Sequence, residues 1–428
     1  MSNILEFLSL QNPNVRYVAI GMILLGISAG VIGCFTLLRK RALVGDAVAH
    51  SVLPGVCIAF MVSGTKSMAV LLPGAVLSGW LSLLCIDYIV SHSRIKADAA
   101  IGLVLSVFFG IGIFLLTIIQ QSGNAAQAGL DKFLFGKAAA LIGNDVWTLG
   151  IAALFIVLMV VLFYRPFKIV SFDPQFAHSI GLPVRRLEML LAGLTVMAVA
   201  LGIQAVGVVL MAAMLITPAA AARYWTDRLG VMLVLSAVFG AFAGIAGSYI
   251  SYTAPSMPTG PWVVVTLSAI VFFSLLFAPK KGLFMQYLRR YRNRQKIRRE
   301  NVLKIFYQLG EHNQLFLAGR SNQELTDRRA MPDAELQQGL NDLAAQGSIV
   351  LDTSGWHLTE SGLQKARRLV RIHRLWEVYL SHKLQLPPDH VHETADALEH
   401  IITPELEKLL ESQLEYPHAD PHNNPIPY

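Results

Sequence analysis

A carboxylate and an imidazole interrupt an apolar stretch in the first part of the chain. Asp46 and His50 are four residues apart within residues 43–63, so on a helix they share one face. Ionisable groups are costly in an apolar segment, and a carboxylate with an imidazole is a ligand pair for Mn²⁺, Zn²⁺ or Fe²⁺. Spacing alone also allows another interpretation, in which Asp46 caps the helix after Gly45 and His50 is a hydrogen-bonded interior residue.

A second group of metal-ligating residue types lies near the C-terminus. His373 and Glu377 are four residues apart on one expected helix. The next expected helix carries four more such residues on one face: His392, Asp396, Glu399 and His400. This spacing suits a metal site, and it is also compatible with the solvated charged face of an ordinary helical domain.

The composition places these two groups in different environments. Hydrophobic residues make up 54% of the 428 residues and charged residues only 15%, which is too apolar for an ordinary soluble enzyme. Nearly all long uncharged runs lie before Pro279, whereas the tail from Lys280 has the charge density of a soluble domain. The three cysteines all lie in apolar stretches without a CxxC spacing, so we expect neither disulfides nor a zinc site from them.

Runs of membrane-spanning length divide the apolar part into about nine expected transmembrane helices. Seven of them cover residues 17–38, 43–63, 67–86, 99–119, 146–164, 229–252 and 260–278. Residues 189–222 are long enough for two more spans, broken near Gly202 to Gly207. The span at 43–63 contains Pro54–Gly55, which predicts a discontinuous helix.

Basic residues mark alternate connections between these spans. Arg39 to Arg41 and Arg223 with Arg228 belong to one set, whereas the connection YTAPSMPTGP of the opposite set has no basic residue. Short cytoplasmic loops are enriched in Lys and Arg. We therefore expect the N-terminus outside and the tail in the cytoplasm.

The chain divides into four expected segments. Residues 1–279 form a transmembrane domain, and residues 280–299 form a basic juxtamembrane linker without an acidic residue. The linker suits anionic lipid headgroups, with nucleic acid as the alternative partner. Residues 300–360 read as three helices and a hairpin, the order of a winged helix, and residues 361–428 read as helical. The fold class is an all-α polytopic membrane protein with a cytoplasmic winged-helix and helical domain.

Three motifs follow one another within residues 10–280: RKRALVGDAVAHSVLPGVCIAF, SFDPQFAHSIGLPV and GVVLMAAMLITPAAAARYW. They resemble the metal-ion permeases of ABC transporters, the family that imports manganese, zinc or iron. The resemblance implies that Asp46 and His50 line the translocation path and gate metal entry. It also implies a loop that docks on the ATPase, although an ordinary interhelical loop is the alternative. The residues of that loop are Phe172, Asp173, Pro174, Phe176 and Gly181.

This resemblance also implies partners. No GxxxxGK[ST] phosphate loop occurs in the sequence, so we expect the chain to be a transport subunit without enzyme activity that binds no nucleotide, with ATP hydrolysis on a separate subunit. An extracytoplasmic metal-binding protein, a second permease copy and the bacterial inner membrane complete the expected setting. An ion-coupled secondary carrier is the rival among transporters.

The tail contains VRIHRLWE, HVHETADALEH and NNPIP in that order. These stretches resemble the diphtheria-toxin-repressor family of iron- and manganese-dependent regulators across residues 300–428. The resemblance implies that residues 361–428 dimerise and bind a regulatory metal ion. It assigns a metal triad to Asp396, Glu399 and His400, and further ligand positions to His373, Glu377 and His392. An oxygen ligand at Asp396 favours Mn²⁺.

Two departures from the repressor family bear on the function of the tail. The nearest matches to its first-helix ligands are Asn301 and Lys304, so we expect one well-formed metal site and not two. The expected DNA-reading helix, PDAELQQGLNDLAAQG, has three carboxylates and no basic residue, which opposes binding to phosphates. We therefore expect a metal sensor that does not bind DNA, and a membrane-tethered metal-dependent transcriptional regulator is the alternative.

Overall fold

The structure, a computed structural model, consists of two compact units, Met1–Gln286 and Tyr287–Tyr428. The residues that it describes are 11–65, 67–121, 141–253, 257–328, 331–384 and 402–428, with positions 7, 9, 136 and 138. The boundary between the units lies inside the basic segment 280–299. The finer boundaries of the four expected segments stay predictions.

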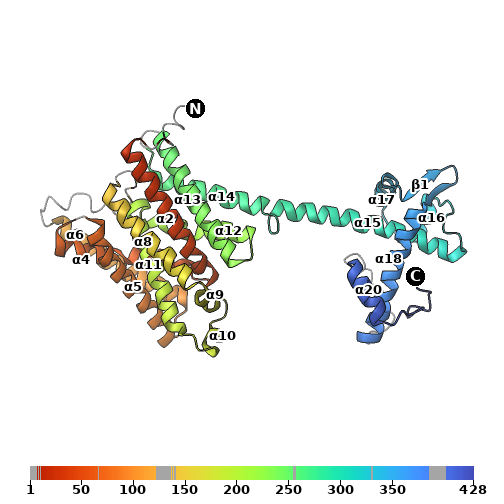
Figure 1. The fold of residues 1–428 in the computed structure, drawn as a ribbon, viewed down its shortest axis with the longest axis horizontal. Coiled ribbons are helices and arrows are strands. Elements are labelled where there is room, and N and C mark those ends of the chain that lie inside the picture. Colours follow the sequence, from red (N-terminus) through yellow and green to blue (C-terminus); the bar gives the residue numbers. More distant parts are fainter. Residues whose placement is uncertain are drawn as a thin grey trace. The chain divides into compact units, whose positions relative to one another are not determined.

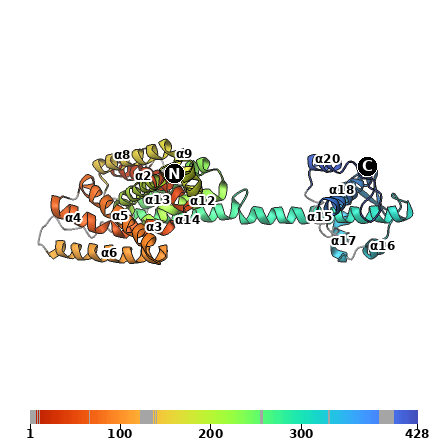
Figure 2. The ribbon, with the colours of Figure 1, turned by 90° about the horizontal axis from the view of Figure 1, so that it is seen from below.

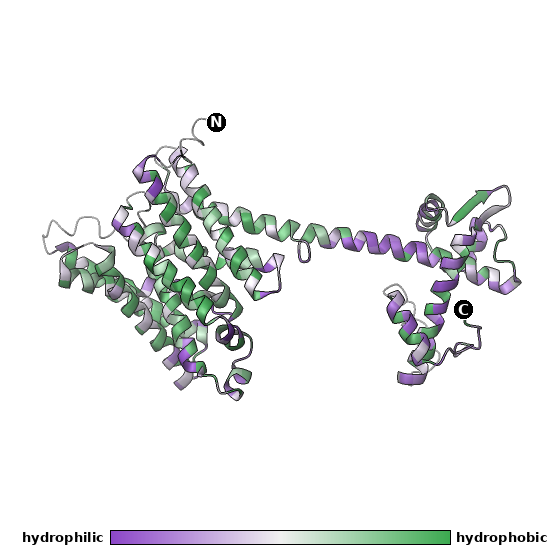
Figure 3. Cartoon of the chain, viewed as in Figure 1, coloured by the Kyte–Doolittle hydropathy of each residue, from purple (hydrophilic) through white to green (hydrophobic). Residues whose placement is uncertain are grey.

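The first unit is a bundle of helices, most of which are predominantly apolar (Figures 1 and 3). Its helices are α2 (Pro13–Leu38), α3 (Ala42–Ser51), α4 (Leu53–Ser63), α5 (Met68–His92), α6 (Ala97–Gln121), α8 (Gly143–Leu162), α9 (Tyr164–Phe172), α10 (Pro174–Ser179), α11 (Val184–Val206), α12 (Val208–Trp225), α13 (Leu229–Thr253) and α14 (Thr259–Phe277). Within the described residues, eight helices, with α3 and α4 taken together, are long and apolar enough to cross a membrane. The 18-residue α12 is not among the eight, so the count of nine stays a prediction.

Two interruptions that the sequence predicts are present in the bundle. The span 43–63 divides at Val52 into α3 and α4, with Pro54 in the first turn of α4, where the missing N–H of proline costs no helical hydrogen bond. The region 189–222 divides at Gly207, whose φ of 88° is favourable only for glycine. Both breaks therefore follow from local backbone chemistry.

Helix α2 packs most closely against α13 through facing glycines. Gly26 and Gly30 lie on α2, and Gly240 and Gly244 lie on α13. A Cβ atom on Gly26 would lie 2.2 Å from the carbonyl oxygen of Gly240, and a Cβ on Gly240 would lie 2.1 Å from that of Gly26. The backbones are therefore in direct contact, as in the small-residue crossings of membrane helices.

We expect Gly26→Val and Gly240→Val each to destabilise the bundle by about 3 kcal/mol, because backbone atoms cannot move aside for the added carbons. Thermal unfolding in detergent measures the effect. Gly102→Val is the matched control, since Gly102 lies on α6 with no heavy atom within 4 Å of an added Cβ. Equal stability of Gly26→Val and Gly102→Val would contradict the close crossing.

Helix α6 lies along one edge of the bundle beside α3, α4 and α5 (Figure 2). Its contacts include Gly112, where an added Cβ would lie 2.7 Å from Leu53 on α4. The ring of Phe109 lies edge-on to His50. This edge helix therefore fixes one side of the segment that carries Asp46 and His50.

The second unit consists of helices and one hairpin around its own apolar core. Its elements are α15 (Leu283–Asn313), α16 (Asn322–Arg328), α17 (Asp333–Ala345), β1 (Ile349–Asp352), β2 (Gly355–Leu358), α18 (Glu360–Leu384) and α20 (Pro404–Gln413). The strands pair antiparallel, with Ile349 opposite Leu358 and Asp352 opposite Gly355, so the predicted hairpin is confirmed. Three helices before a hairpin is the predicted order, and the winged-helix assignment itself stays a prediction.

Candidate metal sites and docking helix

The acidic and imidazole pair lies in the interior of α3. Arg41 is the N-cap of this helix, so the interpretation of Asp46 as a capping residue is wrong. The Nε2 atom of His50 lies 3.7 Å from Oδ1 of Asp46, which is too long for a hydrogen bond. The Nδ1 atom of His50 is buried with no hydrogen-bond partner among the described residues, so the interpretation of a hydrogen-bonded interior histidine also fails for that atom.

The separation in this pair suits joint ligation of one cation. Two donor atoms that each lie about 2.1 Å from an ion can be up to about 4 Å apart, and 3.7 Å falls within that limit. The side chains are 47% exposed for Asp46 and 23% for His50, so an ion can reach both. Two ligands do not complete a coordination shell, and the remaining ligands must come from water or from another chain.

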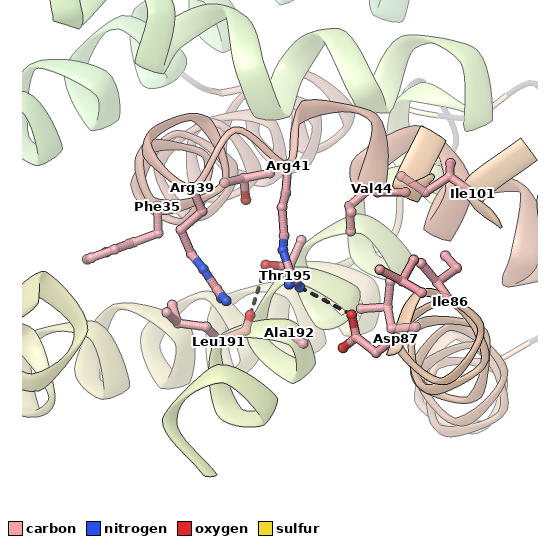
Figure 4. A pocket seen from close by; sticks show the side chains of 14 residues that line it. Phe35, Arg39, Arg41, Val44, Ile86, Asp87, Ile101, Leu191, Ala192 and Thr195 are labelled. Atoms are coloured by element: carbon pink, nitrogen blue, oxygen red, sulfur yellow. Dashed lines mark hydrogen bonds and ion pairs between the residues drawn. The ribbon is translucent and has the colours of Figure 1, made fainter. Parts of the chain in front are cut away.

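A cavity of about 100 Å³ lies at the junction of α2 and α3 (Figure 4). Asp87 contributes a carboxylate to the lining of this cavity, and the guanidinium group of Arg41 lies 3.5 Å from it. Arg39, which also lines the cavity, pairs with Glu188. Because arginine holds both carboxylates, this cavity is no second metal site. The pairs instead connect the end of α2 to α11 and the start of α3 to α5. Neither pair was predicted from the sequence, although acidic residues at the ends of apolar spans are a signal for them.

The predicted docking loop contains the short helix α10. The carboxylate of Asp173 caps this helix by accepting a hydrogen bond from the N–H of Phe176 at 2.9 Å, and Pro174 occupies its first turn. The segment ends at Gly181 with a φ of 80°. Phe172 and Phe176 are 55% and 53% exposed. Two aromatic rings on an exposed segment with a capped helix are the type of surface that inserts into a groove of a partner.

The predicted regulatory ligands of the tail are described only in part. His373 and Glu377 lie on α18 with 4% and 2% exposure, and Nε2 of His373 lies 3.2 Å from Oε1 of Glu377. Lys304 of α15 lies 2.9 Å from the other ring nitrogen. His392, Asp396, Glu399 and His400 lie outside the described residues. Within the part of the chain that the structure describes, no group of three or more His, Cys, Asp or Glu is placed to hold a metal ion.

The acidic face of α17 is less negative than its sequence indicates. Asp342 pairs with Arg298 of α15 at 2.8 Å, so a residue of the basic segment neutralises it. Asp333 and Glu335 lie exposed in the first turn of α17. Two carboxylates that form no ion pair among the described residues therefore remain on the helix that the sequence predicts to read DNA.

Comparison with known proteins agrees with both expected resemblances. Residues 11–278 match the family described as ABC 3 transport family. Residues 359–428 match the iron dependent repressor, metal binding and dimerisation domain.

Individual relatives are similar along much of this chain. The manganese transport system membrane protein MntC of Bacillus subtilis is 46% identical over 89% of this chain and 87% of its own length. The zinc transport system membrane protein TroC of Treponema pallidum is 42% identical over 65% of this chain and 93% of its own length. The solved structure of PsaBC from Streptococcus pneumoniae in complex with Fab covers 67% of this chain and 99% of that chain, with 34% identity and a TM-score of 0.60.

Proposed function

The chain belongs to the ABC 3 transport family, and from that premise we propose that it is the membrane-spanning subunit of an ATP-driven importer of divalent transition metal ions. The observation that carries the proposal is the Asp46–His50 pair, two metal-ligating groups 3.7 Å apart on an apolar helix. Mn²⁺ is the favoured cargo because a carboxylate and an imidazole suit it, and a relative is named for manganese. Zn²⁺ and Fe²⁺ suit the same ligands, and uptake assays with each ion distinguish the three.

The proposed importer needs further subunits. The ATPase is a separate chain that docks on α10, and an extracytoplasmic protein delivers the metal ion. Two permease copies enclose the path, so that the exposed side of Asp46 faces the partner. The distribution of basic residues supports an inner-membrane orientation with the N-terminus outside and the tail in the cytoplasm. Crosslinking of cysteines introduced beside Asp46 tests the proposed dimer.

The tail is proposed to sense delivered metal and to regulate transport in cis. This proposal is supported by the match of residues 359–428 to a metal binding and dimerisation domain. The metal is Mn²⁺ or a similar ion. Its expected ligands are His373, Glu377, His392, Asp396, Glu399 and His400.

We expect the tail not to bind duplex DNA with sequence selectivity at physiological salt, because Asp333 and Glu335 repel phosphates. Fluorescence anisotropy with the fragment 287–428 measures this. The double variant Asp333→Lys with Glu335→Lys is the matched comparison, and we expect it to bind DNA about tenfold more tightly at low salt. Tight, sequence-selective binding by the unmodified fragment would favour the membrane-tethered regulator.

A further inference from the structure

The short helix α10 is flanked on both sides by segments that contact one end of α2. Before α10, the buried ring of Phe167 on α9 packs edge-on against Phe35 of α2, with the ring centres 5.8 Å apart. After α10, Glu188 near the start of α11 pairs with Arg39, the C-cap of α2. We propose that Arg39 and Glu188 are positioning residues that transmit movement of α10 to the metal-ligand pair of α3, an inference that rests on the proposed importer function.

The connection from α10 to α11 is short and hydrogen-bonded. Ala177 of α10 is fully buried, and its carbonyl oxygen accepts a hydrogen bond from the N–H of Leu182 at 3.1 Å. Pro183, whose ring restricts φ, is the N-cap of α11. We therefore expect α10 and the start of α11, which carries Glu188, to move together when a partner pulls on α10.

The turn from α2 to α3 also has little freedom. The N–H of Lys40 donates a hydrogen bond to the carbonyl oxygen of Leu37 at 3.1 Å, and Lys40 has a left-handed backbone with a φ of 56°. The N–H of Arg41 donates to the carbonyl oxygen of Thr36, also at 3.1 Å. These bonds form the Schellman motif that ends a helix. Asp46 follows as the fifth residue of α3, about 6 Å along its axis, so a shift at the end of α2 reaches the ligand pair directly.

Burial distinguishes the Arg39–Glu188 pair from its neighbour. The side chains of Arg39 and Glu188 are 11% and 34% exposed, and removing one partner of a buried ion pair leaves a charge without compensation. The pair of Arg41 with Asp87, which joins α3 to α5, is 45% and 58% exposed, so water screens its attraction. The better shielded pair is thus the one that reaches the segment after α10.

Side-chain packing does not fill the junction beside these pairs. The cavity of about 100 Å³ is lined from α2, α3 and α11, among others by Phe35, Val44 and Leu191 (Figure 4). Dispersion contacts are lost across an unfilled space, so the ion pair carries a larger share of the connection between α2 and α11 here. The same space gives the first turn of α3 room to shift without steric overlap.

The number of Mn²⁺ ions transported per ATP hydrolysed tests the inference, in proteoliposomes that hold the full-length permease with the ATPase and metal-binding subunits of the proposed importer. Arg39→Gln and Glu188→Gln each remove one charge and leave the exposed rings of the docking segment in place. We expect the ATPase to stay bound and active while the ratio falls roughly tenfold. A variant that is merely less stable would lose uptake and hydrolysis together and keep the wild-type ratio.

Arg41→Gln is the matched control for these variants. It removes an arginine from the same turn, but its exposed partner Asp87 lies on α5 and not beside α10, so we expect the ratio of the wild type. A wild-type ratio in both Arg39→Gln and Glu188→Gln would overturn the inference and leave the proposed function intact. Absence of ATP-dependent uptake in the wild type would overturn the proposed function and this inference together.

A cysteine pair distinguishes a fixed link from a latch that must open. Arg39→Cys with Glu188→Cys removes both charges, and we expect a low ratio that a short bismaleimide raises roughly fivefold or more by rejoining the two helices. The wild type treated with the same reagent controls for reaction at the three native cysteines. If the reagent instead stops uptake in the double variant alone, the two residues must separate during transport, and the proposed fixed link is wrong.

Discussion

Asp46→Ala and His50→Ala are each expected to reduce Mn²⁺ uptake to the background of cells without the permease. Each substitution removes one of two ligands that lie 3.7 Å apart on α3, and one remaining protein ligand holds the ion too weakly to pass it on. Neither side chain is fully buried, so the apolar core of the bundle remains intact. We therefore expect both variants to insert into the membrane and to dimerise as the wild type does.

Radioactive Mn²⁺ uptake at matched expression measures the loss, and Ser51→Ala is the matched control. Ser51 lies on the same helix, fully buried, and its hydroxyl has no hydrogen-bond partner among the described residues. Removing an unpaired buried hydroxyl should not destabilise the protein. The double variant should be no worse than either single one, because the two groups act on one ion. Uptake close to wild type in both single variants would disprove the gate.

Features that depend on neighbouring residues could be predicted from the sequence. The break of the span 43–63 follows from Pro54, and the break between α11 and α12 follows from Gly207. The hairpin follows from the turn between Asp352 and Gly355, which has apolar residues on both sides. In each case the physical cause lies within a few residues of its effect.

Features that depend on packing could not be predicted. The sequence shows Lys304 where the repressor family has a ligand, but the contact of Lys304 with His373, 69 positions away, depends on how α15 and α18 pack. Likewise, the sequence predicts that Asp342 repels DNA phosphates, whereas the structure shows that Arg298 neutralises it. Nothing in the local pattern specifies such pairs, because helix orientation and crossing geometry decide which side chains meet.

The facing glycines of α2 and α13 lie between these two cases. Each helix has glycines four residues apart, at 26 and 30 and at 240 and 244, a spacing typical of close helix crossings in membranes. The spacing alone does not say which two helices meet, since other pairs of spans also contain glycine.

Phe172→Asp combined with Phe176→Asp is expected to abolish co-purification of the ATPase with this permease. Both rings are more than half exposed, so their replacement should leave the bundle folded. Ala177, which lies beside Phe176 in α10, is fully buried, so a substitution there would instead disturb the packing of the helix. If the rings insert into an apolar groove, each aspartate must be desolvated there without a partner, which costs several kcal/mol. The affinity should then fall by at least about a hundredfold.

The matched control for this prediction replaces the same two residues with leucine. Leucine keeps the side chains apolar and leaves the cap of α10 by Asp173 unchanged, so Phe172→Leu with Phe176→Leu should retain the complex. Retention by the leucine variant and loss by the aspartate variant would assign the contact to apolar insertion and not to helix geometry. A complex that survives purification with both aspartates would place the coupling contact on another cytoplasmic segment, and α10 would then be an ordinary connection between α9 and α11.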